Sequence, residues 1–454
     1  MSVQSVNPAN EEIIETFTPH NDADIERTLA RAEETFRHWR LTSFSERAQL
    51  MENAASLLDD RKDTLARHMT LEMGKPLSQA IGEVEKCAWV CRHYAQNAAQ
   101  YLADEKISAD ASSSYVRHLP LGPILAVMPW NFPLWQVFRF AAPTLMAGNV
   151  ALLKHASNVW RCAIDIEEIF RDAGFPEGCF QTMLIGSDKV EQVLSDRRVM
   201  AATLTGSGPA GSAVAATAGK HIKPSVLELG GTDAFIVMPS ADIEAAVKTA
   251  IAGRTQNTGQ SCIAAKRFFV HEDVYDTFKG GFVEGMRALI LGDPLDDKTD
   301  LGPLAMKGIR DDLEKQTRAS IEAGAKALLP TPQLPEKGWW AAPQILEEAP
   351  ETAPAFHDEM FGPVASLWKI PNLATGIERA NRSDFGLGSA IFTQDESDID
   401  TAVCDLEAGS TFVNSKVSSD PRLPFGGVKQ SGYGRELASD GIKAFVNRKT
   451  VSIA

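Results

Sequence analysis

The chain has 454 residues, of which 44% are hydrophobic and 23% charged, and a formal net charge of -15 at pH 7. This length and composition predict a folded protein of two or three domains. The negative charge, without any basic run, argues against nucleic-acid binding, which needs clustered Lys and Arg. The six cysteines are scattered, which fits a reducing compartment. Cys87 and Cys91 are four apart but have no second ligand pair, so we predict core packing and no metal site.

The N-terminal part of the chain has mainly helical sequence patterns. Residues 1–12 contain neither the basic region nor the apolar stretch of a secretory signal, which favours a cytoplasmic location. Asn21, with Asp24 three residues later, predicts a helix start. Apolar residues at helical spacing continue from residue 45 to about residue 103.

Beyond residue 120, short apolar runs alternate with helical stretches. This alternation predicts a parallel sheet covered by helices on both faces. The expected strands are residues 124–128, 150–153, 182–185, 200–204 and 226–229, and a helix is expected at 161–172. The most apolar segment, residues 124–140, is interrupted by prolines, an asparagine and an arginine, so we expect no membrane span.

A second alternating series follows Gly231 and predicts a second α/β unit. Its expected strands are residues 234–237, 268–270 and 411–414, and its expected helices are residues 243–252 and 274–289. The glycine-rich segment 424–434 is expected to be irregular. Residues 112–121 are typical of one strand of a protruding ribbon without its own core. Such ribbons usually pair with another chain, which favours a homodimer or homotetramer.

Cys262 and Glu228 each stand in a stretch of small or turn-forming residues. A cysteine thiolate is nucleophilic enough to attack a carbonyl carbon. If a thioester follows, water must be activated to release the acid, and a glutamate whose pKa is raised by partial burial can take that proton. Glycines close to both residues leave room for a ligand. We therefore interpret the pair as nucleophile and general base.

Five ordered motifs are spread over residues 130–429: Trp130-Asn131-Phe132-Pro133, Leu227-Glu228-Leu229-Gly230-Gly231, Gly259-Gln260-Ser261-Cys262, Glu359-Met360-Phe361-Gly362-Pro363 and Pro424-Phe425-Gly426-Gly427-Val428-Lys429. Together they resemble the NAD(P)-dependent aldehyde dehydrogenases, most of all the succinate semialdehyde dehydrogenases. The resemblance implies an α/β protein with a Rossmann-like cofactor domain, a second α/β catalytic domain and a small β-ribbon oligomerisation arm. The cofactor domain is expected to comprise residues 1–101 and 121–230, and the catalytic domain residues 231–435. The arm is expected to comprise residues 102–120 and 436–454.

The resemblance assigns the nucleophile to Cys262 and the base for deacylation to Glu228. Asn131 would donate its side-chain amide to the oxyanion, together with the backbone N–H of Cys262. Attack on an aldehyde places negative charge on its oxygen, and loss of one preorganised donor typically costs ~3 kcal/mol. The implied reaction oxidises an aldehyde to a carboxylic acid through a thiohemiacetal and a thioester on Cys262.

The resemblance also implies a site for the nicotinamide end of a cofactor. Glu359 would bind the nicotinamide ribose hydroxyls, with Phe361 and Trp130 beside it. Gly206 and Ser207 resemble the family's turn near the pyrophosphate, where a helix N-terminus attracts phosphate through its exposed N–H groups.

Two further residues bear on the choice of cofactor. Lys154 corresponds to the family lysine on the adenosine ribose, and Ser157 stands where NAD-preferring members often have a glutamate. A carboxylate there would repel a 2'-phosphate, whereas serine leaves space and a hydroxyl donor. We therefore predict that NADP is preferred and that NAD is the second cofactor.

Four residues are implied in substrate binding. Arg139 matches an arginine that succinate semialdehyde dehydrogenases direct at the far carboxylate, and Ser419 falls near the serine used beside it. Gln256 stands where those enzymes often carry a second arginine. Because glutamine is uncharged, this difference weakens the assignment to succinate semialdehyde or indicates a broader substrate range. Trp135 would narrow the entrance and favour slender aldehydes. Succinate semialdehyde is therefore the predicted substrate.

Three alternatives stay open at the level of the sequence. One is a broad-specificity enzyme for aromatic or aliphatic aldehydes, and another is a CoA-acylating semialdehyde dehydrogenase. The third is a nonenzymatic protein that keeps only the fold. Glu228 favours water over CoA as acyl acceptor, and the presence of Cys262 and Asn131 argues against the nonenzymatic alternative.

Overall fold

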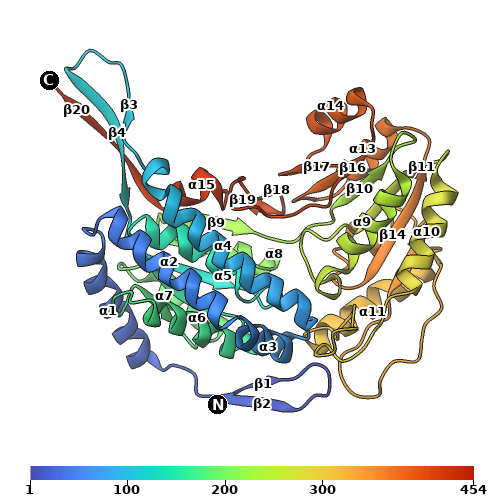
Figure 1. Ribbon diagram of the computed structural model, residues 1–454, viewed down its shortest axis with the longest axis horizontal. Helices are drawn as coiled ribbons and strands as arrows, with labels where there is room; N and C mark the ends of the chain where they lie inside the picture. Colours follow the sequence, from blue (N-terminus) through green and yellow to red (C-terminus); the bar gives the residue numbers. More distant parts are fainter. Residues whose placement is uncertain (1) are drawn as a thin grey trace.

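Two sheets, each flanked by helices, and a separate three-stranded arm organise the chain in the computed structural model (Figure 1). The structure describes residues 2–454, so Met1, which the predicted cofactor domain includes, lies outside the described residues. No helix within residues 2–454 has the length and apolar character needed to cross a membrane.

The N-terminal region is a hairpin followed by four helices. The hairpin strands are β1 (Val3–Val6) and β2 (Ile13–Phe17), and the helices are α1 (Asp22–Trp39), α2 (Phe44–Asp60), α3 (Lys62–Met73) and α4 (Leu77–Tyr101). Asn21 caps α1 and forms a capping box with Asp24, so the predicted helix start is confirmed. Cys87 and Cys91 are fully buried in α4, as core packing predicts.

The first sheet has the order β19-β9-β8-β5-β6-β7, with β19 antiparallel and the others parallel. Its strands are β5 (Pro123–Met128), β6 (Val150–His155), β7 (Phe180–Thr182), β8 (Ala201–Thr205), β9 (Ser225–Glu228) and β19 (Gly432–Tyr433). The connecting helices are α5 (Trp135–Met146), η1 (Ser157–Val159), α6 (Trp160–Asp172), η2 (Ser187–Lys189), α7 (Val190–Ser195) and α8 (Gly208–Lys220). This arrangement is the Rossmann-like part of the predicted fold class.

Two local predictions in this region were wrong. The strand expected at 182–185 is observed as β7, which ends at Thr182. The last pair between β6 and β7 is Leu153 with Thr182, and the chain turns away from β6 just after this pair. The segment 424–434, expected to be irregular, contains β18 (Val428–Lys429) and β19. Both are two-residue strands, too short to produce an apolar pattern, and they exist because the chain returns to β9 and β15 (Phe385–Gly386).

The second sheet has the order β12-β13-β14-β11-β10-β16-β17, with only β12 antiparallel. Its strands are β10 (Ala234–Val237), β11 (Arg267–His271), β12 (Lys326–Ala327), β13 (Gln344–Glu347), β14 (Val364–Ile370), β16 (Ser389–Phe392) and β17 (Thr411–Val413). Its helices are α9 (Ile243–Thr255), η3 (Gln256–Gly259), α10 (Tyr275–Arg287), α11 (Lys307–Glu322), α12 (Pro354–His357), α13 (Leu373–Asn381) and α14 (Glu396–Asp405). Phe268 packs toward α10 and Phe269 toward the opposite face, as the two-residue period of a strand requires.

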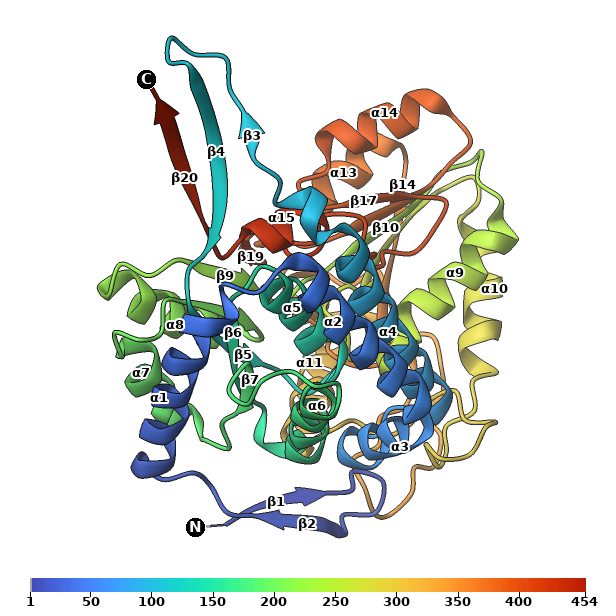
Figure 2. The same cartoon turned by 60° about the vertical axis from the view of Figure 1, so that its left-hand side comes forward.

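The three-stranded arm projects away from both sheets (Figures 1 and 2). It consists of β3 (Glu105–Lys106), β4 (Ser113–Pro120) and β20 (Val446–Ile453), and β20 follows the short helix α15 (Ala438–Lys443). Strand β4 lies between the other two and is antiparallel to both. The predicted domain bounds stay a prediction.

Candidate active site

The loop that carries Cys262 connects α9 with β11 and has an unusual backbone. Asn257 and Thr258 both have φ of 55°, and Gly259 follows with φ of 77°. Left-handed conformations are unfavourable for residues with a side chain and persist only where the surroundings hold them. Arg254 Nη2 provides such support by donating to the Gly259 carbonyl oxygen at 2.6 Å. The loop is therefore a fixed platform for the thiol.

Cys262 lies where two cavities meet. The large cavity has a volume of about 470 Å³, and the small cavity has a volume of about 240 Å³. The large cavity is lined by the four predicted substrate residues, Arg139, Trp135, Gln256 and Ser419. The small cavity is lined by Asn131 and five predicted cofactor residues, Trp130, Gly206, Ser207, Glu359 and Phe361. Cys262 lines both cavities, so the residue predicted as nucleophile borders each of them.

Asn131 is oriented by a network of amides. Its Nδ2 donates to the Gln260 carbonyl oxygen at 3.1 Å, and its Oδ1 accepts from Gln136 Nε2 at 3.1 Å. An amide nitrogen has two hydrogens, so a second one stays available for an oxygen in the small cavity. Among residues 2–454 no acceptor is bonded to the backbone N–H of Cys262. The two donors predicted for an oxyanion therefore lie close to the nucleophile.

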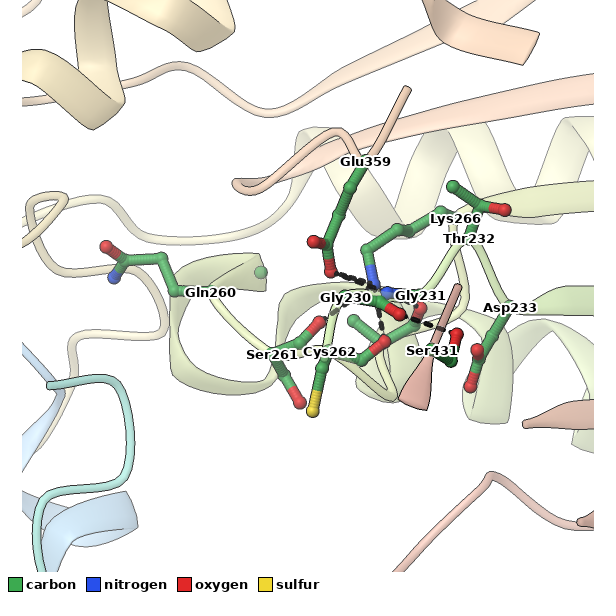
Figure 3. Close-up of polar contacts among 12 residues, drawn as sticks. Gly230, Gly231, Thr232, Asp233, Gln260, Ser261, Cys262, Lys266, Glu359 and Ser431 are labelled. Atoms are coloured by element: carbon green, nitrogen blue, oxygen red, sulfur yellow. Dashed lines mark hydrogen bonds and ion pairs between the residues drawn. The ribbon is translucent and has the colours of Figure 1, made fainter. Parts of the chain in front are cut away.

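The Cys262 thiol is protonated in the free protein. Burial, and next the negative charge of Glu359, raise its pKa to about 12. Lys266 opposes this effect, since its ammonium donates to the Cys262 carbonyl oxygen at 2.8 Å and lies 3.4 Å from Glu359 Oε1. Figure 3 shows Lys266 between Glu359 and the Cys262 turn, while the sulfur points away from both. Glu359 also accepts from the Gly231 N–H at 3.1 Å.

Glu228 is buried and lines neither cavity. Burial raises its pKa well above the usual value, and the neighbouring carboxylate of Glu436 raises it further. Arg139 acts in the opposite direction, because its guanidinium is ion-paired with Glu436 and lowers the pKa of both carboxyls. A β-carbon at Gly426 would lie 2.7 Å from Glu228 Oε1, so glycine leaves the space that this carboxylate uses. The predicted base is therefore set apart from the thiol in this conformation.

The small cavity suits the nicotinamide end of a dinucleotide. The rings of Trp130 and Phe361 meet edge to face at 5.8 Å on its wall. Ser207 precedes α8 without making a side-chain cap, which leaves first-turn N–H groups for a phosphate. Lys154, at the end of β6, and Ser157, at the start of η1, do not line this cavity. They lie at the carboxyl end of β6, next to β5 in the sheet. A dinucleotide that extends out of the small cavity along this edge of the sheet would reach them.

The large cavity contains two cations that the sequence analysis missed, Lys86 and Lys416. Lys86 Nζ donates to Ser419 Oγ at 2.8 Å, and Lys416 Nζ donates to Gln256 Oε1 at 3.4 Å. The sequence carries no signal for either, because a lysine on an amphipathic helix or in a loop normally faces solvent.

A family model described as the aldehyde dehydrogenase family matches residues 1–451. The chain belongs to the aldehyde dehydrogenase family. The resemblance found in the sequence is thereby confirmed, and the chain is an NAD(P)-dependent aldehyde dehydrogenase. A solved aldehyde dehydrogenase from Sinorhizobium meliloti, described as NAD-dependent, superposes with a TM-score of 0.97 at 29% identity and covers 100% of this chain and 91% of that one.

Relatives with closer sequences carry more specific names. A protein of Mycobacterium avium named succinate-semialdehyde dehydrogenase (NADP(+)) is 52% identical over 457 positions, covering 100% of this chain and 97% of that protein. A Synechocystis protein named probable succinate-semialdehyde dehydrogenase (NADP(+)) is 49% identical and covers 100% of both. The crystal structure of succinic semialdehyde dehydrogenase from Streptococcus pyogenes with NADP+ has a TM-score of 0.97 at 36% identity, covering 99% of both chains. These superpositions confirm the predicted fold class.

The raised pKa of the Cys262 thiol leads to a prediction for the free protein. Between pH 7 and 9, alkylation of Cys262 by iodoacetamide should rise about tenfold per pH unit, because only the thiolate reacts. Glu359→Gln should speed it by about threefold to tenfold, since removal of a nearby negative charge favours the thiolate. Mass spectrometry of the labelled peptides measures both rates, with the exposed Cys404 as internal reference. An equal or slower rate in the Glu359 variant would contradict this electrostatic account.

Proposed function

We propose that this enzyme oxidises succinate semialdehyde to succinate with NADP. The observation that carries the proposal is the position of Cys262, whose sulfur is shared by a cavity lined with cations and a cavity that suits a nicotinamide. The first matches an aldehyde with a distal carboxylate. The names of the relatives from Mycobacterium avium and Synechocystis support the same substrate and cofactor.

The chemistry begins at the sulfur. Cys262 first loses its proton to solvent; the thiolate then bonds to the aldehyde carbon, and the carbonyl oxygen becomes an oxyanion held by Asn131 Nδ2 and the Cys262 N–H. NADP, when bound, supplies the acceptor for the hydride that leaves this carbon. The acyl group then remains on Cys262 as a thioester. Attack of water on the thioester breaks the C–S bond, releases the acid and restores the thiol.

We assign Glu228 as the general base that takes the proton of the attacking water. Its carboxylate is buried beside Glu436 and Gly426, so it has to rotate toward Cys262 to act. Because burial, and next the charge of Glu436, raise the pKa of Glu228, the base keeps its proton to a higher pH than an exposed glutamate does. Hydrolysis should therefore speed up as pH rises toward the pKa of this carboxyl and level off above it.

A Glu228→Gln variant should separate the two halves of the reaction. Reduction of NADP by one equivalent per active site should stay fast, and steady-state turnover should fall by about 100-fold because the thioester has lost its base. Stopped-flow absorbance at the NADPH band measures the burst. The exposed Glu85 on α4 offers a matched control, and Glu85→Gln should behave as wild type. Unchanged turnover in the Glu228 variant would remove this residue from the mechanism.

We assign the choice of cofactor to Lys154 and Ser157. Ser157 is exposed at the start of η1, and among residues 2–454 no carboxylate lies within 4.0 Å of Lys154 Nζ. Ser157 follows Lys154 by three residues, and an uncharged hydroxyl together with an ammonium can bind the dianionic 2'-phosphate of NADP. Because position 157 is serine and not glutamate, no carboxylate at this position repels the phosphate.

Steady-state kinetics should give a higher kcat/KM with NADP than with NAD when succinate semialdehyde is the substrate. Ser157→Glu should reduce this NADP:NAD ratio by about 100-fold, since a carboxylate would repel the phosphate and accept from the ribose hydroxyls of NAD. A wild-type enzyme that uses NAD better would refute the cofactor proposal. A preference for uncharged aldehydes over succinate semialdehyde would refute the substrate proposal.

We also propose that the arm joins subunits into a homodimer or homotetramer. Strands β20 and β3 are the edges of the three-stranded sheet; Ile453 on β20 is 50% exposed and Ile107, next to β3, is 52% exposed. An edge strand with unpaired N–H and C=O groups and apolar side chains is a surface that normally pairs. We propose a second copy of this chain as the partner, because every copy carries the same edge strand β20.

Removal of residues 447–454 should therefore weaken assembly. The cut spares the Phe445 carbonyl oxygen, which accepts from Asn149 Nδ2 at 3.0 Å and ties the end of α15 to the first sheet. In sedimentation velocity the full chain should run as a dimer or tetramer and the truncated chain as a smaller species. A truncated chain with the wild-type sedimentation coefficient and normal cofactor binding would show that assembly uses another surface.

A further inference from the structure

A buried ammonium lies directly behind the turn that carries the nucleophile. Lys266 is 1% exposed and lines neither cavity. Its backbone is fixed immediately before β11, because its N–H donates to the Asp233 carbonyl oxygen at 3.0 Å and its own carbonyl oxygen accepts from the Ser366 N–H at 2.9 Å. The side chain therefore extends from a rigid part of the second sheet toward the turn (Figure 3).

Three carbonyl oxygens of the turn accept from this ammonium. Its nitrogen lies 2.9 Å from the Ser261 oxygen, 2.8 Å from the Cys262 oxygen and 3.2 Å from the Ala264 oxygen. A protonated lysine has three N–H donors, so this set of acceptors matches the charged form. Burial lowers the pKa of Lys266, and the Glu359 carboxylate, 3.4 Å from the nitrogen, acts in the opposite direction. The turn is thus held by a positive charge as well as by hydrogen bonds.

One of these carbonyls belongs to the peptide group that supplies a proposed oxyanion donor. The Ser261 oxygen and the Cys262 N–H are the two ends of a single planar trans peptide, so they point in nearly opposite directions. The Ser261 oxygen is fixed from two sides, by Lys266 Nζ and by the Ala264 N–H at 3.1 Å. Within residues 2–454 no acceptor is bonded to the Cys262 N–H. The contact of the Ser261 oxygen with Lys266 therefore aims this N–H away from the ammonium.

The charge also strengthens the same donor. A cation on a carbonyl oxygen draws electron density along the amide toward that oxygen, which leaves more positive charge on the N–H hydrogen. In a site that excludes water, such a preorganised donor needs no reorganisation when an oxyanion forms. Burial of an ammonium is costly, so a neutral side chain would hold the turn with a smaller penalty. What the charge adds is stabilisation of negative charge at the far end of this peptide.

We propose that Lys266 is a positioning residue for the oxyanion site, which aims and polarises the N–H of Cys262 through the Ser261 carbonyl. The assignment rests on the proposed function, because the Cys262 N–H needs this support only if an oxyanion forms beside it. Asn131, the other proposed donor, is oriented by Gln136 and by the Gln260 carbonyl oxygen. The two donors are thus oriented by different groups, so each can be weakened without removal of the other.

The test measures the hydrogen bonds on a thioester carbonyl in the oxyanion site. A Glu228→Gln parent is acylated with p-nitrophenyl acetate without cofactor: the Cys262 thiol loses its proton to solvent, the thiolate takes the acetyl group, and p-nitrophenolate leaves. Infrared difference spectra with and without an isotope label on the acetyl carbonyl carbon isolate its stretching band. Lys266→Met in this parent should move the band to higher wavenumber, because a weaker donor polarises the carbonyl less. The sulfur is already acylated, so the pKa of the thiol does not affect this band.

Two further variants complete the comparison. Lys266→Gln keeps an N–H donor without the charge and should give a smaller shift in the same direction, and it is sufficient on its own if Lys266→Met does not fold. Arg254→Met removes another buried cation of the same loop, whose Nη2 donates to the Gly259 oxygen at 2.6 Å. The N–H of that peptide belongs to Gln260 and donates to the Asn257 oxygen at 3.0 Å, so Arg254→Met should leave the band in place.

Turnover gives a second readout. With native Glu228 and saturating NADP, the burst of NADPH in Lys266→Met should be about 10-fold slower than in the wild type. Outright loss of an oxyanion donor typically slows turnover by about 100-fold or more, and in this variant the donor is weakened but kept.

The possible outcomes separate the role of Lys266 from the proposed function. Absence of acetyl from the Cys262 peptide in mass spectrometry, or a band that Asn131→Ala does not move, would overturn the proposed oxyanion site and the role of Lys266 with it. A band that Asn131→Ala moves but the Lys266 variants do not would overturn the Lys266 assignment alone, as would an unchanged burst rate. A shift of equal size in Arg254→Met would assign the effect to a loosened loop and would also overturn the Lys266 assignment.

Discussion

The buried ammonium of Lys266 connects the nucleophile loop with the small cavity. It donates to the carbonyl oxygens of Ser261, Cys262 and Ala264, and it faces the Glu359 carboxylate at 3.4 Å. Burial lowers the pKa of this lysine, so its charge persists only because these acceptors surround it. The turn that presents the thiol and the carboxylate assigned to the cofactor are thus held by one cation.

Charge is separated into zones around Cys262. The large cavity has two lysines that form no ion pair within residues 2–454, the small cavity has Glu359 and the start of α8, and Glu228 is buried close to Glu436 and Arg139. Each zone suits one participant in the proposed reaction: an anionic aldehyde, a dinucleotide and a water-activating base. Cys262 borders both cavities, whereas Glu228 lines neither of them.

Secondary structure was predictable wherever a long pattern repeated. The start of α1 follows from Asn21 and Asp24, and the buried strand β10 was found at its observed bounds because a run of apolar residues is bounded by polar ones. The two-residue strands β18 and β19 were missed, because two residues form no pattern and their partners are far away in sequence. Local propensity cannot report a strand that exists only through distant pairing.

The sequence by itself determined the family, since its motifs are local and need no knowledge of the fold. The same motifs led to the roles that we propose for Cys262, Glu228 and Asn131. The predicted substrate residues line the large cavity and five of the predicted cofactor residues line the small one, whereas Lys86 and Lys416 were not anticipated. Only the tertiary structure decided that Arg139 is paired with Glu436 and that Lys86 donates to Ser419, because these partners come from segments about 300 or more residues apart. The charge that a side chain has left for a ligand depends on which distant groups fold against it, and that information is absent from any local motif.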